Sequence, residues 1–242
     1  MIPDREPPYA GIAFDCDSTL STIEGVEEIA AGHPQLEELT RRAMACEIAL
    51  EEVYAQRLEW VRPSRDDLLR VGRRYVETSL PNAGALVAAL RSLGKRVCIV
   101  SGGLLPAVRV LAEELGVPAG DTFAVDVEFH SDGSYRDFDR SSPLARSKGK
   151  PELLTRLRGE TAGAWALVGD GATDLEAAPV LDRFVAFGGV ERRGPVFERA
   201  RAHCDDPDLA ALLPWLADAA EIETLAENPD HRALVRAARS PL

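Results

Sequence analysis

The stretch Phe14-Asp15-Cys16-Asp17-Ser18-Thr19-Leu20 decides the fold of this chain, because two acidic residues directly follow the apolar run from Ala10 to Phe14. A run of that composition predicts a strand buried on both faces, as in a parallel sheet. At the carboxyl end of such a strand, Asp15 and Asp17 would enter the crevice where open α/β sheets bind ligands. Two carboxylates this close repel each other, so we expect either a cation beside them or a proton on one of them.

The size and composition of the chain limit the kinds of protein that it can be. With 242 residues, 45% of them hydrophobic, it can form one large domain, or a core domain with a smaller insert. The net charge of −12 argues against a nucleic-acid partner, which needs a basic face. It also means that an anionic substrate would have to be held by local positive charge. A monomer and a homodimer are both compatible with the sequence.

The sequence predicts a cytoplasmic protein without a membrane span. It contains no uncharged apolar stretch of about 18 residues, the length needed to cross a bilayer. The first eight residues carry charges and prolines where a signal peptide would be apolar. Zinc sites and disulfides are not expected, because neither the cysteines nor the histidines show metal-ligand spacing. These residues are Cys16, Cys46, Cys98 and Cys204, and His33, His130, His203 and His231.

Four short apolar runs share one design, in which a buried strand ends in small or polar residues. They are Ala10–Phe14, Arg96–Val100, Ala164–Val168 and Phe184–Phe187. Helical patterns separate most of them, over Ala83–Leu93, Leu104–Leu115 and Glu152–Leu157. This alternation predicts an α/β fold, with a parallel sheet wrapped by helices.

Three other segments depart from this alternation. Thr122–His130 alternates apolar and polar residues and turns into Tyr135–Phe138, which predicts a β-hairpin. Residues 21–79 carry no strand signal and follow the first strand, so we expect a helical cap over the crevice. The predicted division is a core of residues 1–20 and 80–242 and a cap of residues 21–79. Beyond Glu221 we expect peripheral helix or disorder.

An ordered set of motifs carries the chemistry. It consists of Asp15-x-Asp17-x-Thr19, Ser101-Gly102, Lys148 in Ser-Lys-Gly-Lys, and Gly169-Asp170-Gly171-Ala172-Thr173-Asp174. A lone Asp-x-Asp often caps a turn, and Ser101-Gly102-Gly103 alone is typical of a helix N-cap. Together, in this order at strand ends, the motifs resemble the haloacid dehalogenase superfamily of aspartate-nucleophile phosphatases, whose Rossmann-like core agrees with the predicted sheet. In the resemblance, phosphatases carry the second aspartate and dehalogenases lack it.

Within that superfamily the chain resembles the phosphoserine phosphatase family from about Gly11 to Gly189. The further matching segments are Glu24 in Glu-Gly-Val-Glu-Glu-Ile-Ala, Thr40-Arg41-Arg42-Ala43-Met44, Arg57, Val61-Arg62-Pro63-Ser64-Arg65 and Phe187-Gly-Gly. This resemblance implies Mg²⁺-dependent hydrolysis of O-phospho-L-serine, a small-molecule substrate, through an aspartyl-phosphate. Another small phosphorylated metabolite, hydrolysed or used in phosphotransfer, is the alternative. A non-enzymatic binding protein of the same fold is a third hypothesis, although such a protein would be expected to lose Asp15, Asp17 or Lys148.

The resemblance assigns roles around the strand ends. Asp15 and Asp170 would hold Mg²⁺, a hard cation that prefers oxygen ligands, and Asp17 would add its backbone carbonyl. Asp15 would attack phosphorus, and Asp17 would act as general acid and then general base. The expected phosphate ligands are Ser101, Gly102, Gly103 and Lys148. Asp174 would support the metal or orient Lys148.

The same resemblance places substrate contacts in the cap and near the last strand. Glu24 would bind the substrate ammonium and Arg57 its carboxylate. The remaining expected substrate contacts are Met44, Thr173 and Arg193.

Each of these positions also has a simpler interpretation. Glu24 competes with its neighbours Glu27 and Glu28, and Arg57 could pair with glutamates along its own helix. Thr173 could be an N-cap, and Met44 could be core. Lys148 could belong to a solvated basic loop with Arg146 and Lys150.

Overall fold

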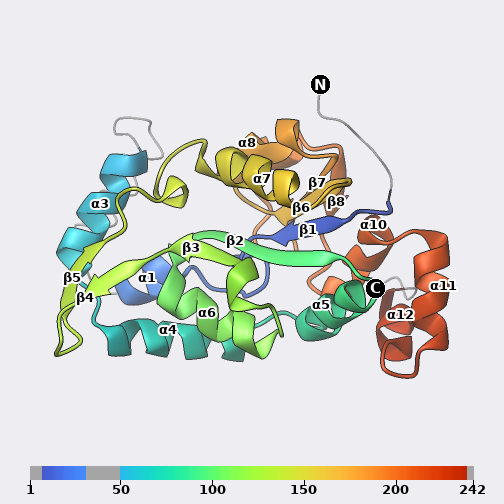
Figure 1. The fold of residues 1–242 in the computed structure, drawn as a ribbon, viewed down its shortest axis with the longest axis horizontal. Coiled ribbons are helices and arrows are strands. Elements are labelled where there is room, and N and C mark those ends of the chain that lie inside the picture. The colour runs from blue at the N-terminus through green and yellow to red at the C-terminus, as the bar shows by residue number, and fades with distance from the viewer. Residues whose placement is uncertain (1–6, 31–49, 239–242) are drawn as a thin grey trace.

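The computed structural model describes residues 7–30 and 50–238, which form a layered α/β structure (Figure 1). Its main sheet has six strands in the order β3-β2-β1-β6-β7-β8. All neighbouring pairs are parallel, which confirms the predicted sheet. The strands are β1 (Gly11–Phe14), β2 (Arg96–Leu104), β3 (Thr122–Val125), β6 (Trp165–Gly169), β7 (Arg183–Phe187) and β8 (Ala202–Cys204).

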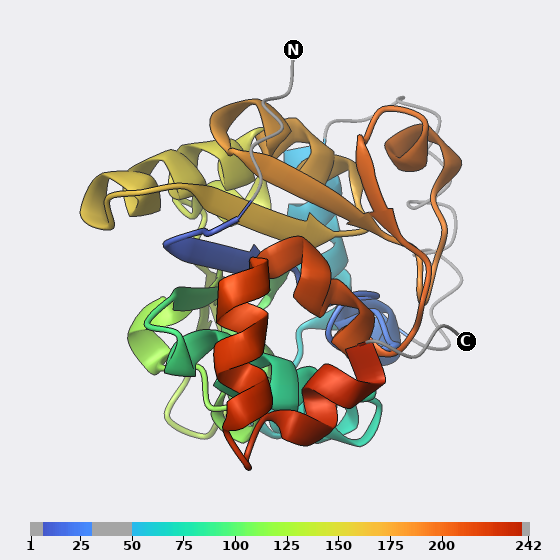
Figure 2. The same ribbon diagram turned by 90° about the vertical axis from the view of Figure 1, so that its right-hand side faces the viewer.

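Helices cover both faces of this sheet. α5 (Ala83–Ser92) and α6 (Leu105–Glu114) lie on one face, and α7 (Gly149–Glu160) and α8 (Ala172–Ala177) lie on the other, as Figures 1 and 2 show together. Strands β1, β6 and β7 are buried at every position, which explains why apolar residues and glycine fill them apart from Arg183 at the start of β7. The shorter helices are α9 (Gly194–Phe197) and α10 (Leu213–Leu216), and single 3-10 turns lie at Ala119–Asp121, Pro143–Ala145, Ala178–Val180 and Leu209–Leu212.

The segment that follows β1 is helical where it is described. It contains α1 (Gly25–Ala30), α3 (Leu50–Val61) and α4 (Arg65–Glu77), with Ser64 and Asp67 forming a capping box at the start of α4. Ser21 and Ser79 form an isolated antiparallel bridge, so the chain leaves and re-enters the core side by side. The division into a core and a cap of residues 21–79 stays a prediction. Met44 lies outside the described residues.

The predicted hairpin is only partly right. The alternating run from 122 onward is split: β3 pairs in parallel with β2, and β4 (Val127–Phe129) pairs antiparallel with β5 (Tyr135–Phe138). The apolar residues alternate through both strands, so the pattern could not reveal the change of partner. The hairpin lies beside α3 at the carboxyl-end side of the sheet (Figure 1).

The residues after Glu221 pack as helices at the end of the sheet opposite the hairpin (Figure 1). They belong to α11 (Ala219–Glu227) and α12 (Arg232–Ala238). Lys95, whose side chain is only 2% exposed, donates to Glu221 Oε1 at 2.5 Å and to the carbonyl of Tyr9 at 3.0 Å. An ionised pair with so little water around the ammonium ties α11 to the start of the sheet.

Of the helices in the described ranges, none combines the length and the apolar character that a bilayer crossing requires.

Replacing Glu221 with Gln is expected to lower the free energy of unfolding by about 1–3 kcal/mol, because the buried Lys95 loses its counter-charge. Urea denaturation measures this change. Glu128→Gln is the control, since Glu128 and Arg136 are 58% and 63% exposed and 3.7 Å apart. Such surface pairs contribute at most about 1 kcal/mol. Equal stability of the two variants would contradict the anchoring role of Lys95.

Candidate functional site

Two aspartates meet where neighbouring strands end. β1 and β6 pair in register, with Phe14 opposite Val168, so Asp15 and Asp170 leave the sheet at the same edge. The amide of Asp15 donates to the carbonyl of Val168 at 2.9 Å, which extends the ladder to the site itself. Both side chains are buried. The parallel pairing of β1 and β6 therefore brings together two acids that are far apart in the sequence, as the motifs predicted.

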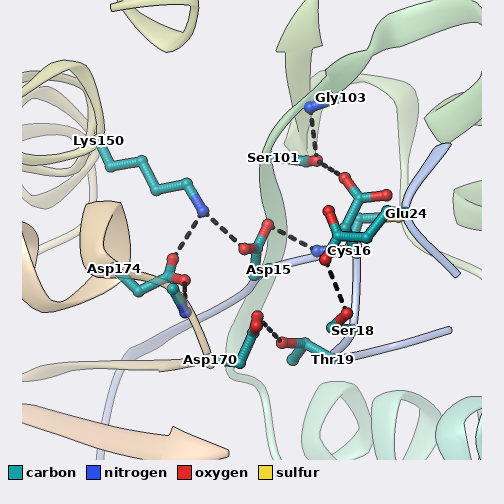
Figure 3. Close-up of polar contacts among 12 residues, drawn as sticks. Asp15, Cys16, Ser18, Thr19, Glu24, Ser101, Gly103, Lys150, Asp170 and Asp174 are labelled. Carbon is teal, nitrogen blue, oxygen red and sulfur yellow. Dashed lines mark hydrogen bonds and ion pairs between the residues drawn. The ribbon is translucent and has the colours of Figure 1, made fainter. Parts of the chain in front are cut away.

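A buried lysine lies between Asp15 and a third aspartate, Asp174. Lys150, in the first turn of α7, has its Nζ 2.9 Å from Asp15 Oδ2 and 2.6 Å from Asp174 Oδ1 (Figure 3). Burial alone would lower the pKa of Lys150, but the charges of Asp15 and Asp174 outweigh it and raise that pKa above its usual value. The ammonium therefore stays protonated beside Asp15, where it can neutralise an anion.

The expectation for Lys148 is corrected by this geometry. Lys148 is exposed, its backbone is left-handed with φ +61°, and its amide donates to Glu176 Oε2 at 2.8 Å. The helix begins at Gly149, which packs so closely on Pro143 that an added Cβ would lie 1.5 Å from the carbonyl oxygen. The chain thus turns at 148 and 149, and the next lysine, Lys150, enters the site.

One local signal could have identified Lys150 from the sequence. Pro151 is favoured in the first turn of a helix, which puts the residue before it in that turn as well. A cation at a helix N-terminus is unfavourable for the helix dipole. A lysine there indicates carboxylate partners elsewhere in the fold, and those partners are Asp15 and Asp174.

Asp17 is oriented differently from Asp15. Its Oδ1 accepts a hydrogen bond from the amide of Gly25 at 2.7 Å and from the hydroxyl of Tyr75 at 2.5 Å. Its Oδ2 accepts a longer bond, 3.4 Å, from Ser101 Oγ. Burial, followed by the charge of Asp15, raises the pKa of Asp17 to about 6. A carboxyl group of this kind can exchange a proton near neutral pH.

Ser101, Gly102 and Gly103 lie in the last part of β2, rather than after it as predicted. The strand continues to Leu104 with an irregularity in its pairing to β3. Ser101 Oγ accepts a bond from the amide of Gly103 at 2.9 Å, and Figure 3 shows both on the side of Asp15 away from Lys150. Gly102 and Gly103 line the cavity described below. This segment is the candidate phosphate cradle.

Arg193 connects Asp170 to the cap segment. Its Nε lies 2.6 Å from Asp170 Oδ2, and its Nη2 lies 3.1 Å from Glu24 Oε1. Glu24 Oε1 also accepts a bond from Ser18 Oγ at 2.7 Å, and Thr19 donates to Asp170 Oδ1 at 3.2 Å. Burial, followed by the charge of Asp17, raises the pKa of Glu24 to about 7.

A single cavity of about 220 Å³ joins these groups, which is room for a small ligand. Nine of the predicted residues line it, namely Asp15, Asp17, Glu24, Arg57, Gly102, Gly103, Asp170, Thr173 and Arg193. Ser101 and Asp174 contact the lining residues Asp17 and Lys150. Lys148 does not line the cavity. The sequence did not predict that Tyr54, Arg146 and Lys150 also line the cavity.

The acidic groups fit a hard divalent cation. Asp15, Asp170 and Asp174 each offer a carboxylate oxygen, all within 4.8 Å of one another. Oxygen donors on buried carboxylates are the ligands that Mg²⁺ prefers. The side chain of Asp17 is directed to Gly25, Tyr75 and Ser101, which leaves its backbone as the part that could reach a metal. Asp174, predicted as a supporting residue, lies within the acidic group itself.

Comparison with known proteins agrees with this geometry. The haloacid dehalogenase-like hydrolase profile matches residues 9–182. The phosphoserine phosphatase of Mus musculus is 33% identical over 199 residues, covering 81% of this chain and 88% of that protein. The phosphoserine phosphatase of Halobacterium salinarum is 30% identical over 199 residues, covering 80% and 90%. A solved substrate-bound phosphoserine phosphatase complex superposes with a TM-score of 0.72 at 24% identity, covering 87% of this chain and 100% of that one. The last likeness concerns the fold and confirms the predicted fold class.

Replacing Lys150 with Met is expected to lower the free energy of unfolding by about 3 kcal/mol or more at pH 8, because Asp15 and Asp174 then face each other without a cation. Urea denaturation in the presence of EDTA measures this change. Lys148→Met, an exposed change two residues away, is expected to alter the same quantity by less than about 0.5 kcal/mol. If the two variants were equally stable, Lys150 would not be the residue that balances the two acids.

Proposed function

This chain belongs to the haloacid dehalogenase-like hydrolase family, and from that premise we propose that it hydrolyses O-phospho-L-serine to L-serine and phosphate. One observation carries this proposal. The same small cavity contains the acids Asp15 and Asp17 and, from the segment after β1, the oppositely charged Glu24 and Arg57. Phosphoserine carries a phosphate, an ammonium and a carboxylate, and Lys150, Glu24 and Arg57, which all line this cavity, offer the opposite charge to each of them in turn.

In the first step, a carboxylate oxygen of Asp15 attacks phosphorus. The bond between phosphorus and the seryl oxygen breaks, and a proton from Asp17 passes to that oxygen, so that serine leaves as a neutral alcohol. The product on the enzyme is an aspartyl-phosphate at Asp15. Lys150, 2.9 Å from Asp15, supplies positive charge for the phosphate oxygens, and the amide of Gly102, in the cavity wall, supplies a donor.

In the second step, water attacks the phosphorus of the aspartyl-phosphate. Asp17, now ionised, takes the proton from that water while the bond between phosphorus and Asp15 breaks, which releases phosphate and restores both acids. Asp15, Asp170 and the backbone of Asp17 would hold Mg²⁺, with Asp174 beside them. When bound, the ion offsets the negative charge of the phosphoryl group. Burial, followed by the charge of Asp15, already raises the pKa of Asp170. This shift reflects the negative charge that gathers at this edge of the sheet without a cation.

The substrate end of the cavity is supplied by the proposed cap. Arg57, on α3, offers a planar fork suited to a carboxylate, and Glu24 offers a counter-charge for an ammonium. Arg193 contacts both Glu24 and Asp170, so it joins the amino-acid end of the cavity to the phosphate end. A cap that contributes these groups must open to admit substrate and close to exclude water.

Asp15→Asn is expected to reduce phosphate release from phosphoserine to background, because an amide oxygen cannot form the aspartyl-phosphate. Release is measured with Mg²⁺ and after its removal with EDTA, and the wild type is expected to be active only with the ion. Asp132→Asn, in the exposed turn between β4 and β5, is the control and should retain full activity. An active Asp15→Asn enzyme would rule out the nucleophile assignment.

Arg57→Ala is expected to lower kcat/KM for phosphoserine by about 2–4 kcal/mol in transition-state terms, because the substrate carboxylate loses its partner. A panel of small phosphate monoesters that lack the carboxylate should show little change in the same variant. Arg70→Ala, on the outer surface of α4 with its side chain 66% exposed, is the control. Unchanged phosphoserine turnover in Arg57→Ala would indicate a different small phosphomonoester as substrate.

A further inference from the structure

The two oxygens of Asp17 differ in their surroundings. Oδ1 accepts hydrogen bonds from the Gly25 amide at 2.7 Å and from the Tyr75 hydroxyl at 2.5 Å. Two donors use the lone pairs that one carboxylate oxygen presents. Oδ2 faces Ser101 Oγ at 3.4 Å and lies 3.2 Å from where a Cβ on Gly103 would be. Asp17 and Gly103 both line the cavity, and Oδ2, whose one hydrogen bond is long, is the oxygen left to meet the reacting group.

The Tyr75 side chain is closely packed around its contact with Asp17. It lies in the last turns of α4, its side chain is fully buried, and its ring belongs to the core. A buried hydroxyl needs a hydrogen-bond partner, and Asp17 supplies one. A Cβ added at Gly25 would lie 2.0 Å from the Tyr75 hydroxyl. Glycine at position 25 is therefore what lets the phenol and the Gly25 amide approach the same oxygen.

We propose that Tyr75 is a positioning residue for proton transfer: with the Gly25 amide it holds Oδ1 of Asp17, so that Oδ2 alone exchanges the proton with the substrate oxygen and with water. The inference rests on the proposed phosphomonoesterase function. The terminal torsion of an aspartate is broad and roughly two-fold, so an unanchored carboxyl could direct its proton away from the cavity. General acid catalysis requires hydrogen-bond reach between the acid and the departing oxygen.

Both anchors of Asp17 come from the segment after β1. Gly25 begins α1 and Tyr75 lies near the end of α4, whereas Asp17 follows a strand of the core. The segment that carries Glu24 and Arg57 therefore also orients the acid. This arrangement couples the proton-transfer atom to the part of the chain that surrounds the substrate.

The test compares leaving groups in Tyr75→Phe, which keeps the buried ring and removes only the hydroxyl. A seryl oxygen must be protonated as it leaves, whereas acetate leaves acetyl phosphate without help. We expect kcat/KM for phosphoserine to fall about 10- to 100-fold. The kcat/KM for acetyl phosphate should fall less than about threefold. If the wild type prefers 4-nitrophenyl phosphate, that substrate takes the place of acetyl phosphate. The ratio kcat/KM is used because it reports the first step, before Asp17 acts as a base.

Tyr135→Phe is the matched control, because Tyr135 is also buried, its hydroxyl has no hydrogen-bond partner in the described structure, and it does not line the cavity. It should leave both ratios unchanged. Asp17→Asn should show the same selective loss as Tyr75→Phe, and a larger one. Equal losses for both leaving groups in Tyr75→Phe, or no loss, would overturn the proposal and leave Tyr75 as a packing residue.

Gly25→Ala provides a second route if Tyr75→Phe does not fold. It keeps the phenol but requires it to move, so the same selective loss for the seryl leaving group is expected, and equal losses would again overturn the proposal.

The proposed substrate and the proposed role of Tyr75 also fail separately. If the wild type does not hydrolyse phosphoserine but hydrolyses another alkyl phosphate, the proposed substrate is wrong. The leaving-group comparison with that alkyl phosphate then still decides the role of Tyr75.

Discussion

The ion pairs of Lys150 are the interaction on which the rest of the site depends. One ammonium, almost completely buried, is shared by Asp15 at the end of β1 and Asp174 at the start of α8. Without a cation, two carboxylates brought this close by the fold would repel each other, and one would have to take up a proton. With it, a positive charge lies 2.9 Å from Asp15, the residue proposed as the nucleophile.

The parallel sheet explains why these groups meet. In β1 and β6 the chain runs in the same direction and in register, so their carboxyl ends, and the acids that follow them, lie at one edge. β2 brings Ser101 to that edge, and Lys150 reaches it from α7, which covers one face of the sheet (Figures 1 and 3). The segment after β1 then closes the edge from the other side, where Gly25 and Tyr75 hold Asp17. Asp15, Asp17 and Asp170 thus follow strands of the main sheet, while the Gly25 and Tyr75 hydrogen bonds to Asp17 come from the segment between β1 and α5.

Most strands and helices could be predicted because local patterns report burial. Runs that are apolar on both faces became β1, β6 and β7, and helical periodicity located α5 and α6 to within one residue at each end. The pattern failed where two elements share one pattern, as at 122–129, whose alternation fits both the edge of the main sheet and the hairpin. It failed again at β2, where Ser101 and the glycines continue the strand instead of ending it.

The sequence by itself determined the fold class, because apolar runs separated by helical patterns can be recognised locally, and it placed Asp15 and Asp170 just after two of those runs. Pro151 indicated that Lys150 lies in a helical turn, but only the tertiary structure decided that this lysine and not Lys148 joins the site, since a left-handed turn at Lys148 and the close contact of Gly149 with Pro143 set which side chain faces inward. The contact of Tyr75 with Asp17 likewise could not be predicted from the sequence. Its hydroxyl meets Asp17 across 58 positions of chain, and such a contact follows from the packing of helices, on which no local pattern reports.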